Sequence, residues 1–391
     1  MKVSIVGQGY VGLPLAIAAT NAGHEVSAVD LDSTVVEQIN SGKSRIEDIS
    51  DLSIRNALGT NRYKVSSSFT LINEADLVVV CVPTPLTRNH EPDYSYLESA
   101  VTSISQNLNE GALVIIESTV SPGVTRSLVA NILNKSGKRF ELAYSPERID
   151  PGNKKWTVTN TPKLVAGITD SSTQRALDFY KTFVDQVITA TSVEVIETAK
   201  LLENSFRLIN ISFMNEIAEF CWKMKLDVRE VIEAAATKPY GFMPFYPGVG
   251  VGGHCIPVDP SYLSAKAKEI GASTSFIDLA NKINLSLSSY FTVVATELLG
   301  SLKGKKIIVV GVAYKPDVSD VREAPSLDLI KALRNEGADV SWHDQLVKEW
   351  MGEKSSRLSA DYDLAIIANP HTGTDLTQLG AVRILDTRGG Y

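Results

Sequence analysis

Short apolar runs rich in β-branched residues alternate with helical lengths over the first half of the chain. Residues 3–6 and 25–29 are predicted strands, and residues 13–22 between them form a predicted helix that Gly23 ends. Three more strands are predicted at residues 77–82, 113–117 and 141–144. Repeated strand–helix–strand units indicate a parallel sheet. We therefore expect a doubly wound, Rossmann-like domain over residues 1–190.

The pattern changes after this domain. Residues 192–225 contain no helix breaker, residues 226–236 keep a helical composition, and residues 262–299 are helical again after a Gly/Pro-rich loop. We expect a central helical domain over residues 191–300, through which two copies of the chain would form a homodimer.

Strand and helix patterns return in the last third of the chain. The predicted elements are strands at residues 306–311, 339–343, 364–368 and 384–385 and a helix at residues 326–335. We expect a second Rossmann-like domain over residues 301–391. The predicted fold class is therefore α/β, with two doubly wound parallel-sheet domains joined by a central helical domain.

Composition narrows the class of partner. The 391 residues carry 38 Lys and Arg against 45 Asp and Glu, a formal charge of −7, which argues against nucleic acid and anionic membranes as partners. No apolar run approaches the ~18 residues that span a bilayer. Cys81, Cys221 and Cys255 lie far apart without a C-x-x-C pair, so we expect no disulfide framework, no metal site and a reducing cytoplasm.

A glycine-rich turn follows the first predicted strand. Gly7, Gly9 and Gly12 form G-x-G-x-x-G between a strand and a helix, a spacing that lets a pyrophosphate approach the backbone at a helix N-terminus. Asp30 ends the next strand, where a carboxylate bonds a ribose hydroxyl and repels a 2′-phosphate, so NAD is favoured over NADP. The alternative is a plain glycine turn with Asp30 as a helix cap. At the corresponding turn of the second predicted domain, Gly311 is followed by Val312, Ala313 and Tyr314 without a further glycine, so that domain is expected to hold a different ligand.

The segment 246–260 carries a cysteine among glycines. Gly248, Gly250, Gly252 and Gly253 allow close approach of the backbone to a ligand, and Cys255 follows them shortly before a helix expected near residue 260. A thiolate near a helix N-terminus is stabilised and serves as a nucleophile. A buried core role suits Cys81 and Cys221 better. His254 is either a catalytic base or part of the loop architecture, and we favour the second.

Other polar candidates lie at strand ends and on a helix. Glu117, Ser118 and Thr119 follow one predicted strand and Glu147 and Arg148 the next, and ligands bind at the carboxyl ends of strands in open α/β sheets. Lys200 and Asn204 are four residues apart and share a helix face, with Arg207 three residues on. Taken alone, that trio is also typical of a solvated face.

Seven ordered motifs extend from one end of the chain to the other. They are G-x-G-Y-V-G at residues 7–12, V-P-T-P at 82–85, E-S-T-V at 117–120, S-P-E-R at 145–148, A-K-L-L-E-N at 199–204, G-V-G-G-H-C-I-P-V-D-P at 250–260, and Y-K-P at 314–316 with D-V-R-E at 320–323. On these motifs the chain resembles the UDP-glucose/GDP-mannose dehydrogenase family. The resemblance implies four-electron oxidation of the C6 alcohol of a UDP-sugar to a uronic acid for polysaccharide synthesis, with two NAD per substrate.

The resemblance also implies catalytic roles. Cys255 would attack the C6 aldehyde to give a thiohemiacetal, whose oxidation leaves a thioester. Lys200 would stabilise the developing oxyanion, and Asp259 would bond to Lys200 and help to hold water. Glu147 and Thr119 would orient the water that hydrolyses the thioester.

Binding roles follow from the same resemblance, with Asn204 expected near C6 of the substrate and Arg322 near NAD. The residues expected to bind NAD are Gly7, Gly9, Tyr10, Val11, Gly12, Asp30, Pro83, Thr84, Thr119 and Arg322. Those expected to bind the UDP-sugar are Glu147, Arg148, Lys200, Asn204, Phe245, Tyr246, Gly252, Tyr314, Lys315 and Arg388. The sequence ends three residues after Arg388, at Tyr391, whereas relatives commonly extend further, so we carry over no expected contact from a longer tail.

Two segments bear on the sugar. Residues 147–152, E-R-I-D-P-G, are similar to members acting on UDP-N-acetylhexosamines. Residues 238–247, K-P-Y-G-F-M-P-F-Y-P, are similar to the UDP-N-acetylglucosamine subgroup. Arg148 replaces an apolar residue of UDP-glucose enzymes and Pro151 and Gly152 reshape the loop, so the arginine is placed to donate to an acetamido carbonyl; the alternative is pairing with Asp150. We expect a UDP-N-acetylglucosamine 6-dehydrogenase, with a UDP-glucose or a UDP-N-acetylmannosamine dehydrogenase as alternatives.

Two other classes of protein share parts of the pattern. A two-electron hydroxyacid dehydrogenase has the first glycine turn and a helix lysine but needs neither Cys255 nor a second Rossmann-like domain. It would release one NADH per substrate instead of two. A non-catalytic NAD sensor or scaffold would leave Cys255 and Lys200 without a role.

Overall fold

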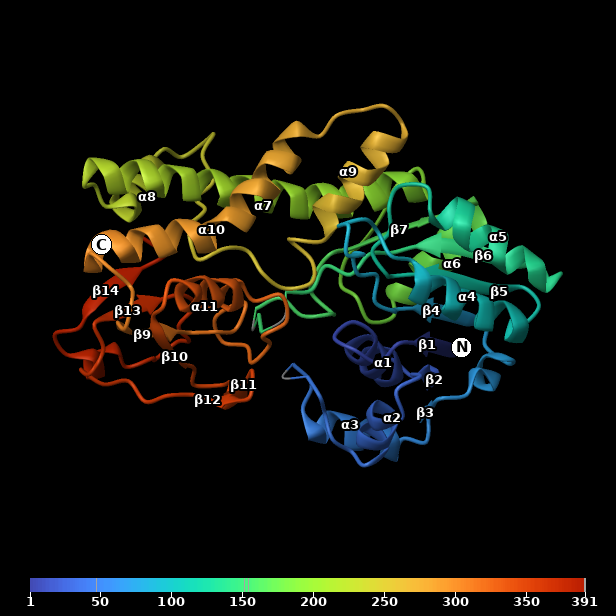
Figure 1. Cartoon of the computed structure of the whole chain (residues 1–391). Helices are drawn as coiled ribbons and strands as arrows, with labels where there is room; N and C mark the ends of the chain where they lie inside the picture. Colours follow the sequence, from blue (N-terminus) through green and yellow to red (C-terminus); the bar gives the residue numbers. More distant parts are fainter. Residues whose placement is uncertain (47, 151, 154, 390–391) are drawn as a thin grey trace. The chain divides into compact units, whose positions relative to one another are not determined.

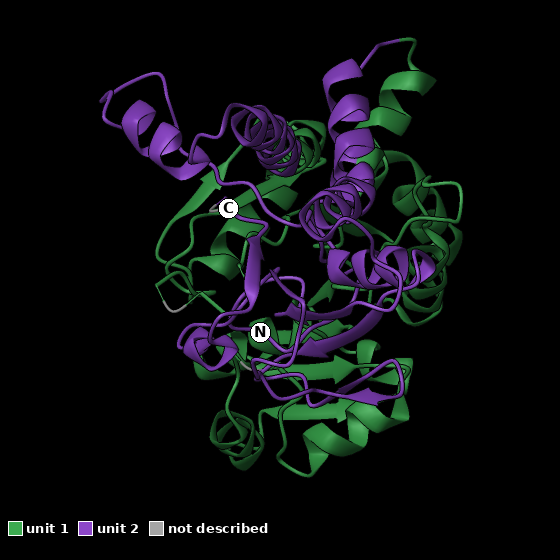
Figure 2. Ribbon diagram, turned by 60° about the vertical axis from the view of Figure 1, so that its left-hand side comes forward, with its two compact units in different colours: residues 1–202, 261–271 green, residues 203–260, 272–391 purple. Residues whose placement is uncertain are grey.

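The computed structural model describes residues 1–46, 48–150, 152–153 and 155–389. These residues form two compact units (Figure 2): residues 1–202 with 261–271, and residues 203–260 with 272–391. Pro151 and Tyr391, both used in the sequence analysis, lie outside the described residues. The division at residues 190 and 300 stays a prediction. Across the described ranges, no helix combines the length and the apolarity that crossing a membrane demands.

The first unit is built on an eight-stranded sheet in the order β3-β2-β1-β4-β5-β6-β7-β8. The strands are β1 (Lys2–Val6), β2 (Glu25–Val29), β3 (Tyr63–Ser66), β4 (Leu77–Val80), β5 (Ala112–Ile116), β6 (Phe140–Tyr144), β7 (Lys163–Gly167) and β8 (Val187–Thr189). Every neighbouring pair is parallel except β6 with β7. The described residues between β6 and β7 form no helix that could carry the chain back for a parallel pairing.

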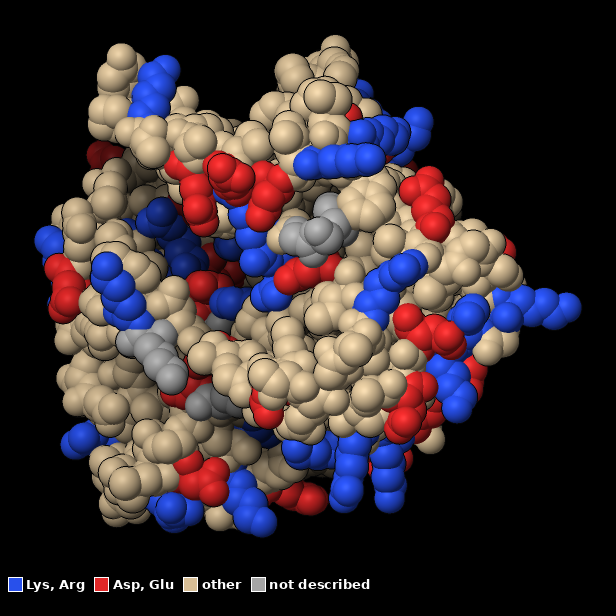
Figure 3. All heavy atoms as spheres, turned by 90° about the vertical axis from the view of Figure 1, so that its left-hand side faces the viewer, with Lys and Arg blue, Asp and Glu red and all other residues tan. Residues whose placement is uncertain are grey.

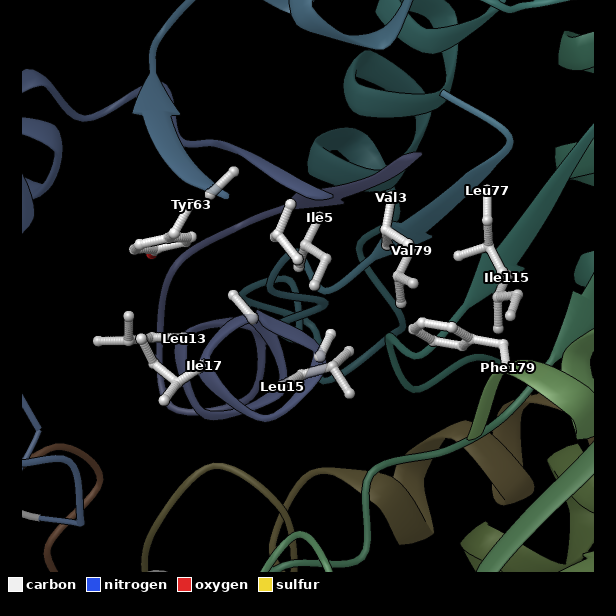
Figure 4. Close-up of a cluster of buried hydrophobic side chains, with 14 of the residues drawn as sticks. Val3, Ile5, Leu13, Leu15, Ile17, Tyr63, Leu77, Val79, Ile115 and Phe179 are labelled. Atoms are coloured by element: carbon white, nitrogen blue, oxygen red, sulfur yellow. The ribbon is translucent and has the colours of Figure 1, made fainter. Parts of the chain in front are cut away.

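Helices cover both faces of this sheet (Figure 1). They are α1 (Gly12–Asn21), α2 (Ser33–Asn40), α3 (Asp51–Gly59), α4 (Ser95–Asn107), α5 (Ala130–Leu133) and α6 (Asp170–Tyr180), with short turns η1 (Phe69–Ile72), η2 (Thr125–Val129) and η3 (Asn134–Ser136). Val3 and Ile5 pack with Leu13 of α1 in one core (Figure 4), whereas Val6 packs in a second core on the opposite face. Burial on both faces explains why the strands are unbroken apolar runs.

Four helices occupy the middle of the chain: α7 (Val193–Met224), α8 (Val228–Ala236), α9 (Asp259–Glu269) and α10 (Ser275–Leu299). The long helix α7 agrees with the predicted breaker-free stretch. The predicted helical segment 262–299 is instead two helices, because Gly271 adopts a left-handed φ of 73° after α9.

The second unit carries a four-stranded parallel sheet in the order β10-β9-β13-β14. Its elements are β9 (Lys306–Val310), α11 (Pro325–Asn335), β10 (Asp339–His343), β13 (Leu364–Ile367), η4 (Leu376–Leu379) and β14 (Arg383–Asp386), plus the hairpin β11 (Glu349–Trp350) and β12 (Glu353–Lys354). Trp342 and Phe291 are fully buried in its core. The two parallel sheets and the helical middle confirm the predicted fold class.

Candidate active site

The turn after β1 contains three glycines. At two of them a side chain would clash with the protein, and at the third it would not. A Cβ atom on Gly7, which has a φ of +93°, would lie 2.5 Å from the carbonyl oxygen of Cys81, and one on Gly12 would lie 1.8 Å from that of Gly7. A Cβ on Gly9 would meet no protein atom within 4 Å. The turn therefore keeps open space at the position where a pyrophosphate would approach the backbone. These residues fit NAD.

Asp30 holds this turn in place. Its Oδ2 accepts the backbone N–H of Gln8 at 2.7 Å, and its Oδ1 accepts that of Asp32 at 3.0 Å. The cap of α2 is Asp32, whose carboxylate accepts the N–H of Thr34, so the alternative of Asp30 as that cap is wrong. Asp30 is half-buried, and each oxygen keeps a lone pair for a ribose hydroxyl.

The loops after β4 and β5 complete this edge of the sheet. Ser118 donates from Oγ to the carbonyl of Val82 at 2.7 Å, and the hydroxyl of Tyr262 donates to the carbonyl of Thr84 at 2.7 Å. Thr119 follows Ser118 and is half-buried. The predicted NAD contacts other than Arg322 therefore lie at the carboxyl ends of adjacent strands: Gly7, Gly9, Tyr10, Val11, Gly12, Asp30, Pro83, Thr84 and Thr119.

Glu147 lies beyond the end of β6 and is fixed on two sides. Its Oε1 accepts the backbone N–H of Arg148 at 2.7 Å and that of Ile149. Its Oε2 lies 4.0 Å from Nζ of Lys163, the first residue of β7. The same Nζ is 3.0 Å from Oε1 of Glu117, so one buried lysine serves two carboxylates.

Sequence reasoning missed Lys163 and Tyr180, although it noted Glu117. Burial raises the pKa of Glu117, and Lys163 only partly offsets this. Burial lowers the pKa of Lys163, but Glu117 and Glu147 outweigh it and the net shift is upward. Burial also raises the pKa of Cys81, which adjoins this cluster and is unsuited to act as a thiolate. Nothing in the sequence marks Lys163, because strand β7 itself is not predicted.

Arg148 makes a contact within the protein. Its Nη1 donates to the carbonyl oxygen of Pro162 at 2.7 Å. A guanidinium has five N–H donors, and this bond uses one of them. A contact with the sugar stays a prediction.

Cys255 is the exposed member of the three cysteines, whereas Cys221 is buried. The carbonyl oxygen of Cys255 accepts the N–H of Asp259 at 2.8 Å, and α9 begins at Asp259. Gly250 and Gly253 have φ values of 132° and 82°, which favour glycine. The loop thus presents a thiol at its surface, close in sequence to a helix N-terminus.

Two glycines of this loop pack directly on the segment after β9. A Cβ on Gly252 would lie 2.4 Å from the carbonyl oxygen of Glu323, and one on Gly253 would lie 2.8 Å from the ring of Tyr314. The glycines are therefore needed for close approach of two loops of the second unit. This packing brings the cysteine loop next to a segment predicted to bind the UDP-sugar.

His254 belongs to the same packing. Its Nε2 is 3.2 Å from Oδ2 of Asp320, and its ring centroid is 6.1 Å from that of Tyr314. Burial lowers the pKa of His254, with a smaller contribution from Arg322. Oδ1 of Asp320 also accepts a hydrogen bond from Nε of Arg322 at 2.9 Å. These contacts favour loop architecture for His254 over a catalytic base.

Asn204 and Asp259 form a buried pair. Nδ2 of Asn204 donates to Oδ2 of Asp259 at 2.6 Å, which joins α7 to the start of α9. Lys200 is buried one turn before Asn204 on α7. The predicted contact between Lys200 and Asp259 stays a prediction.

The nucleotide end of the predicted site lies at the carboxyl edge of the second sheet. Tyr314 and Lys315 follow β9, and Arg388 follows β14, where its Nε and Nη2 bond Asp386 at 2.9 and 2.8 Å. His371 was missed by sequence reasoning. Its Nδ1 accepts the N–H of Asp317, beside Lys315, at 2.8 Å.

The aromatic candidates lie further along the second unit. The ring of Phe245 packs edge-on against Phe206 at 5.6 Å, and Tyr246 is 51% exposed. On the face shown in Figure 3, basic and acidic side chains are interspersed. Among the residues that the structure describes, no three His, Cys, Asp or Glu side chains are grouped to hold a metal ion.

The predicted site residues divide between the two units. The first unit holds the NAD contacts except Arg322, together with Glu147, Arg148 and Lys200. The second unit holds Asn204, Phe245, Tyr246, Gly252, Cys255, Asp259, Tyr314, Lys315, Arg322 and Arg388.

Family models match nearly the whole chain. Residues 1–184 match the NAD binding domain of the UDP-glucose/GDP-mannose dehydrogenase family, residues 194–286 its central domain, and residues 308–389 its UDP binding domain.

Individual relatives match over similar lengths. UDP-N-acetyl-D-mannosamine dehydrogenase of Pyrococcus horikoshii is 33% identical over 380 residues, covering 95% of this chain and 90% of that protein. UDP-N-acetyl-D-glucosamine 6-dehydrogenase of Salmonella typhi is 32% identical over 392 residues, with the same coverage of 95% and 90%. A solved structure of a UDP-D-ManNAc dehydrogenase from Pyrococcus horikoshii has a TM-score of 0.92 and 31% identity, covering 99% of this chain and 95% of that one.

Proposed function

The chain belongs to the UDP-glucose/GDP-mannose dehydrogenase family, and from this premise we propose that it oxidises C6 of UDP-N-acetyl-D-mannosamine from the alcohol to the carboxylate. It is an NAD-dependent oxidoreductase, as the sequence predicts. Its last domain is the family's UDP binding domain, which supports a UDP-sugar as substrate. The resemblance drawn from the seven motifs is thereby confirmed.

The observation that carries the four-electron reaction is the exposed thiol of Cys255 on a glycine loop. NAD, when bound, accepts the hydride removed from C6 in each oxidation. The sulfur of Cys255 adds to the C6 aldehyde, and oxidation of the resulting thiohemiacetal leaves a thioester on the protein. Lys200 is assigned to the developing oxyanion. An enzyme that stopped at two electrons would have no use for this thiol.

Hydrolysis of the thioester is assigned to Glu147 and Thr119. The oxygen of a water molecule bonds to the thioester carbon, its proton passes to Glu147, and the C–S bond breaks to release Cys255 as a thiolate. The two backbone N–H groups on Oε1 of Glu147 support this role, because they fix the direction of the carboxylate.

The choice of sugar differs from the one expected from sequence. Residues 147–152 and 238–247 favoured UDP-N-acetylglucosamine. Relatives named for UDP-N-acetylmannosamine, at 33% identity and at a TM-score of 0.92, support the alternative better. Both sugars carry an acetamido group at C2 and differ in its orientation. Arg148 is the proposed donor to that group.

One experiment tests both the chemistry and the sugar. Purified protein is supplied with NAD and, in turn, with the UDP forms of N-acetylmannosamine, N-acetylglucosamine, N-acetylgalactosamine and glucose, and NADH is counted per sugar consumed. We expect the highest kcat/KM with UDP-N-acetylmannosamine and two NADH per sugar. One NADH per sugar would overturn the four-electron reaction, and a better rate with another sugar would overturn the choice of substrate.

A homodimer is part of the proposal. Phe206, Phe213, Phe220 and Met224 recur along α7 from near its middle to its end and are 44%, 51%, 58% and 57% exposed. A row of large apolar side chains on one helix is typical of a protein interface. A second copy of the chain, bringing the same row, would bury it symmetrically.

A further inference from the structure

A buried charge cluster lies behind Glu147 in the first unit. Nζ of Lys163 is 3.0 Å from Oε1 of Glu117 and 4.0 Å from Oε2 of Glu147. The hydroxyl of Tyr180 on α6 donates to the same oxygen of Glu117 at 2.5 Å, and its ring centroid lies 4.9 Å from the ammonium. Lys163 and Glu117 are 7% and 2% exposed, so solvent screens these charges little.

The cluster contains two carboxylates, those of Glu117 and Glu147, for the one ammonium of Lys163. Glu117 already supplies Lys163 with a carboxylate, and its Oε2 has no hydrogen-bond partner among the described residues. Glu147 adds a second carboxylate on the other side of the lysine. Two carboxylates close together in a poorly solvated site cannot both ionise unless a cation lies between them. Lys163 supplies that cation.

The two carboxylate oxygens of Glu147 face different kinds of group. Backbone N–H groups of Arg148 and Ile149 hold Oε1, whereas Lys163 is the cation facing Oε2. The other titratable groups around Lys163 are Glu117, Tyr180 and the half-buried thiol of Cys81, and Arg148, whose guanidinium is a cation, lines the same small pocket as Glu147 and Lys163.

We propose that Lys163 is a positioning residue for hydrolysis of the thioester: its ammonium attracts Oε2 of Glu147 and so directs the carboxylate, which can then take the proton of the attacking water. This inference rests on the proposed role of Glu147. Lys163 does not touch the substrate and takes no part in the two oxidations. A purely structural lysine, serving only as the counter-ion of Glu117, is the competing explanation.

The test compares Lys163→Met with Lys163→Arg, and with Lys181→Met as a matched loss of an exposed lysine just after α6. Rapid mixing measures the burst of NADH and the steady state, and intact-protein mass spectrometry measures sugar bound to Cys255. In Lys163→Met we expect a burst near that of the wild type, a steady state slower by about tenfold or more at neutral pH, and accumulated adduct. Lys163→Arg should restore turnover, and Lys181→Met should match the wild type.

The difference between the two phases separates positioning from packing, because a loss of packing would lower the burst as well as the steady state. Should Lys163→Met fail to fold, the double variant with Glu117→Gln removes both buried charges and should show the same adduct and the same slow steady state.

Three outcomes would overturn the inference, and the last of them would overturn the proposed role of Glu147 as well. A burst and a steady state that fall equally would make Lys163 a counter-ion of Glu117 only. Adduct in Glu147→Gln but none in Lys163→Met would leave the role of Glu147 standing and remove that of Lys163. No adduct in Glu147→Gln would overturn the role of Glu147, and the inference with it.

Discussion

Asn204 and Asp259 are joined by a buried hydrogen bond of 2.6 Å, from Nδ2 of the asparagine to Oδ2 of the aspartate. The bond ties the middle of α7 to the first residue of the helix that follows the cysteine loop. A buried carboxylate that loses such a donor destabilises the fold, because no hydrogen bond then offsets its removal from water. The pair therefore fixes the loop that carries Cys255 as well as its own two side chains.

Replacement of Asn204 by alanine tests this pair. We expect the free energy of unfolding to fall by about 1–3 kcal/mol, because a charged buried acceptor loses its donor. Turnover should fall as well, because Asn204 is a proposed substrate contact. Asn210→Ala on the same helix is the control, since the Nδ2 of Asn210 donates to the backbone carbonyl of Phe206, which is neutral. Equal urea-unfolding midpoints for the two variants would contradict the expectation.

Replacement of Cys255 by serine tests the nucleophile. A serine hydroxyl is far less ionised than a thiol at neutral pH, so turnover should fall by about a thousandfold or more while NAD and UDP-sugar still bind. Cys221→Ser, at a buried cysteine of α7, is the control and should keep its NADH production. Wild-type turnover in Cys255→Ser would remove the thioester from the mechanism.

Replacement of Asp30 by alanine tests the selection of cofactor. The wild type should turn over faster with NAD than with NADP, because the carboxylate repels a 2′-phosphate. In Asp30→Ala the KM for NAD should rise about tenfold, the worth of ~1.4 kcal/mol. Some loss of stability is also expected, since the N–H of Gln8 loses its acceptor. Equal kcat/KM for the two cofactors in the wild type would refute the assignment.

Replacement of Phe213 by aspartate tests the dimer. A charge at the centre of the exposed row on α7 would be buried without a partner at an interface, which typically costs several kcal/mol. We expect a mass that is halved in light scattering. Phe276→Asp, at another strongly exposed phenylalanine at the start of α10, serves for comparison. A wild type that is already monomeric at micromolar concentration would end the proposal.

Replacement of Asp344 by asparagine tests a buried carboxylate of the second sheet. Although burial opposes ionisation, bonds from His371 and three backbone N–H groups hold the pKa of Asp344 at about 2, below the 3.8 of a free side chain. A lowered pKa stabilises the fold above the unfolded value and loses that effect as the pH falls towards 2. The variant should be less stable by about 2 kcal/mol at pH 6 and by clearly less at pH 3 in urea unfolding. A pH-independent difference would refute the electrostatic explanation.

The β1–α1–β2 unit could be predicted because local pattern determines it. Strands buried on both faces are continuous apolar runs, and Gly7 and Gly12 mark the turn between strand and helix. Strand β7 could not be predicted, because Lys163 at its start carries a charge whose partners come from distant parts of the chain. The break between α9 and α10 depends on the φ of Gly271, which composition does not reveal.

The candidate site was predictable where a motif coincides with a backbone constraint. The cysteine loop stands out in the sequence because Gly252 and Gly253 must admit Glu323 and Tyr314. The bond of Arg148 to Pro162 is different, because a backbone carbonyl acceptor leaves no trace in residue identity.

The turn after the first strand of the second sheet is built like the turn after the first strand of the first sheet. Gly311 and Asp344 have the places there that Gly7 and Asp30 have in the first sheet. A Cβ on Gly311 would lie 2.1 Å from the carbonyl oxygen of Asn369, much as one on Gly7 would strike Cys81. Asp344, like Asp30, accepts an N–H from the turn after the first strand of its sheet, here that of Val312 at 2.9 Å.

The two carboxylates differ in what they have left to offer. Asp344 is 2% exposed and also accepts bonds from Ala313, Leu346, Val347 and His371. Every direction from which a ribose hydroxyl could donate is therefore occupied. An attempt to redesign this sheet for a dinucleotide by adding glycines after Gly311 would fail. The new turn would still lack a carboxylate for the ribose, because that of Asp344 is already bonded within the protein.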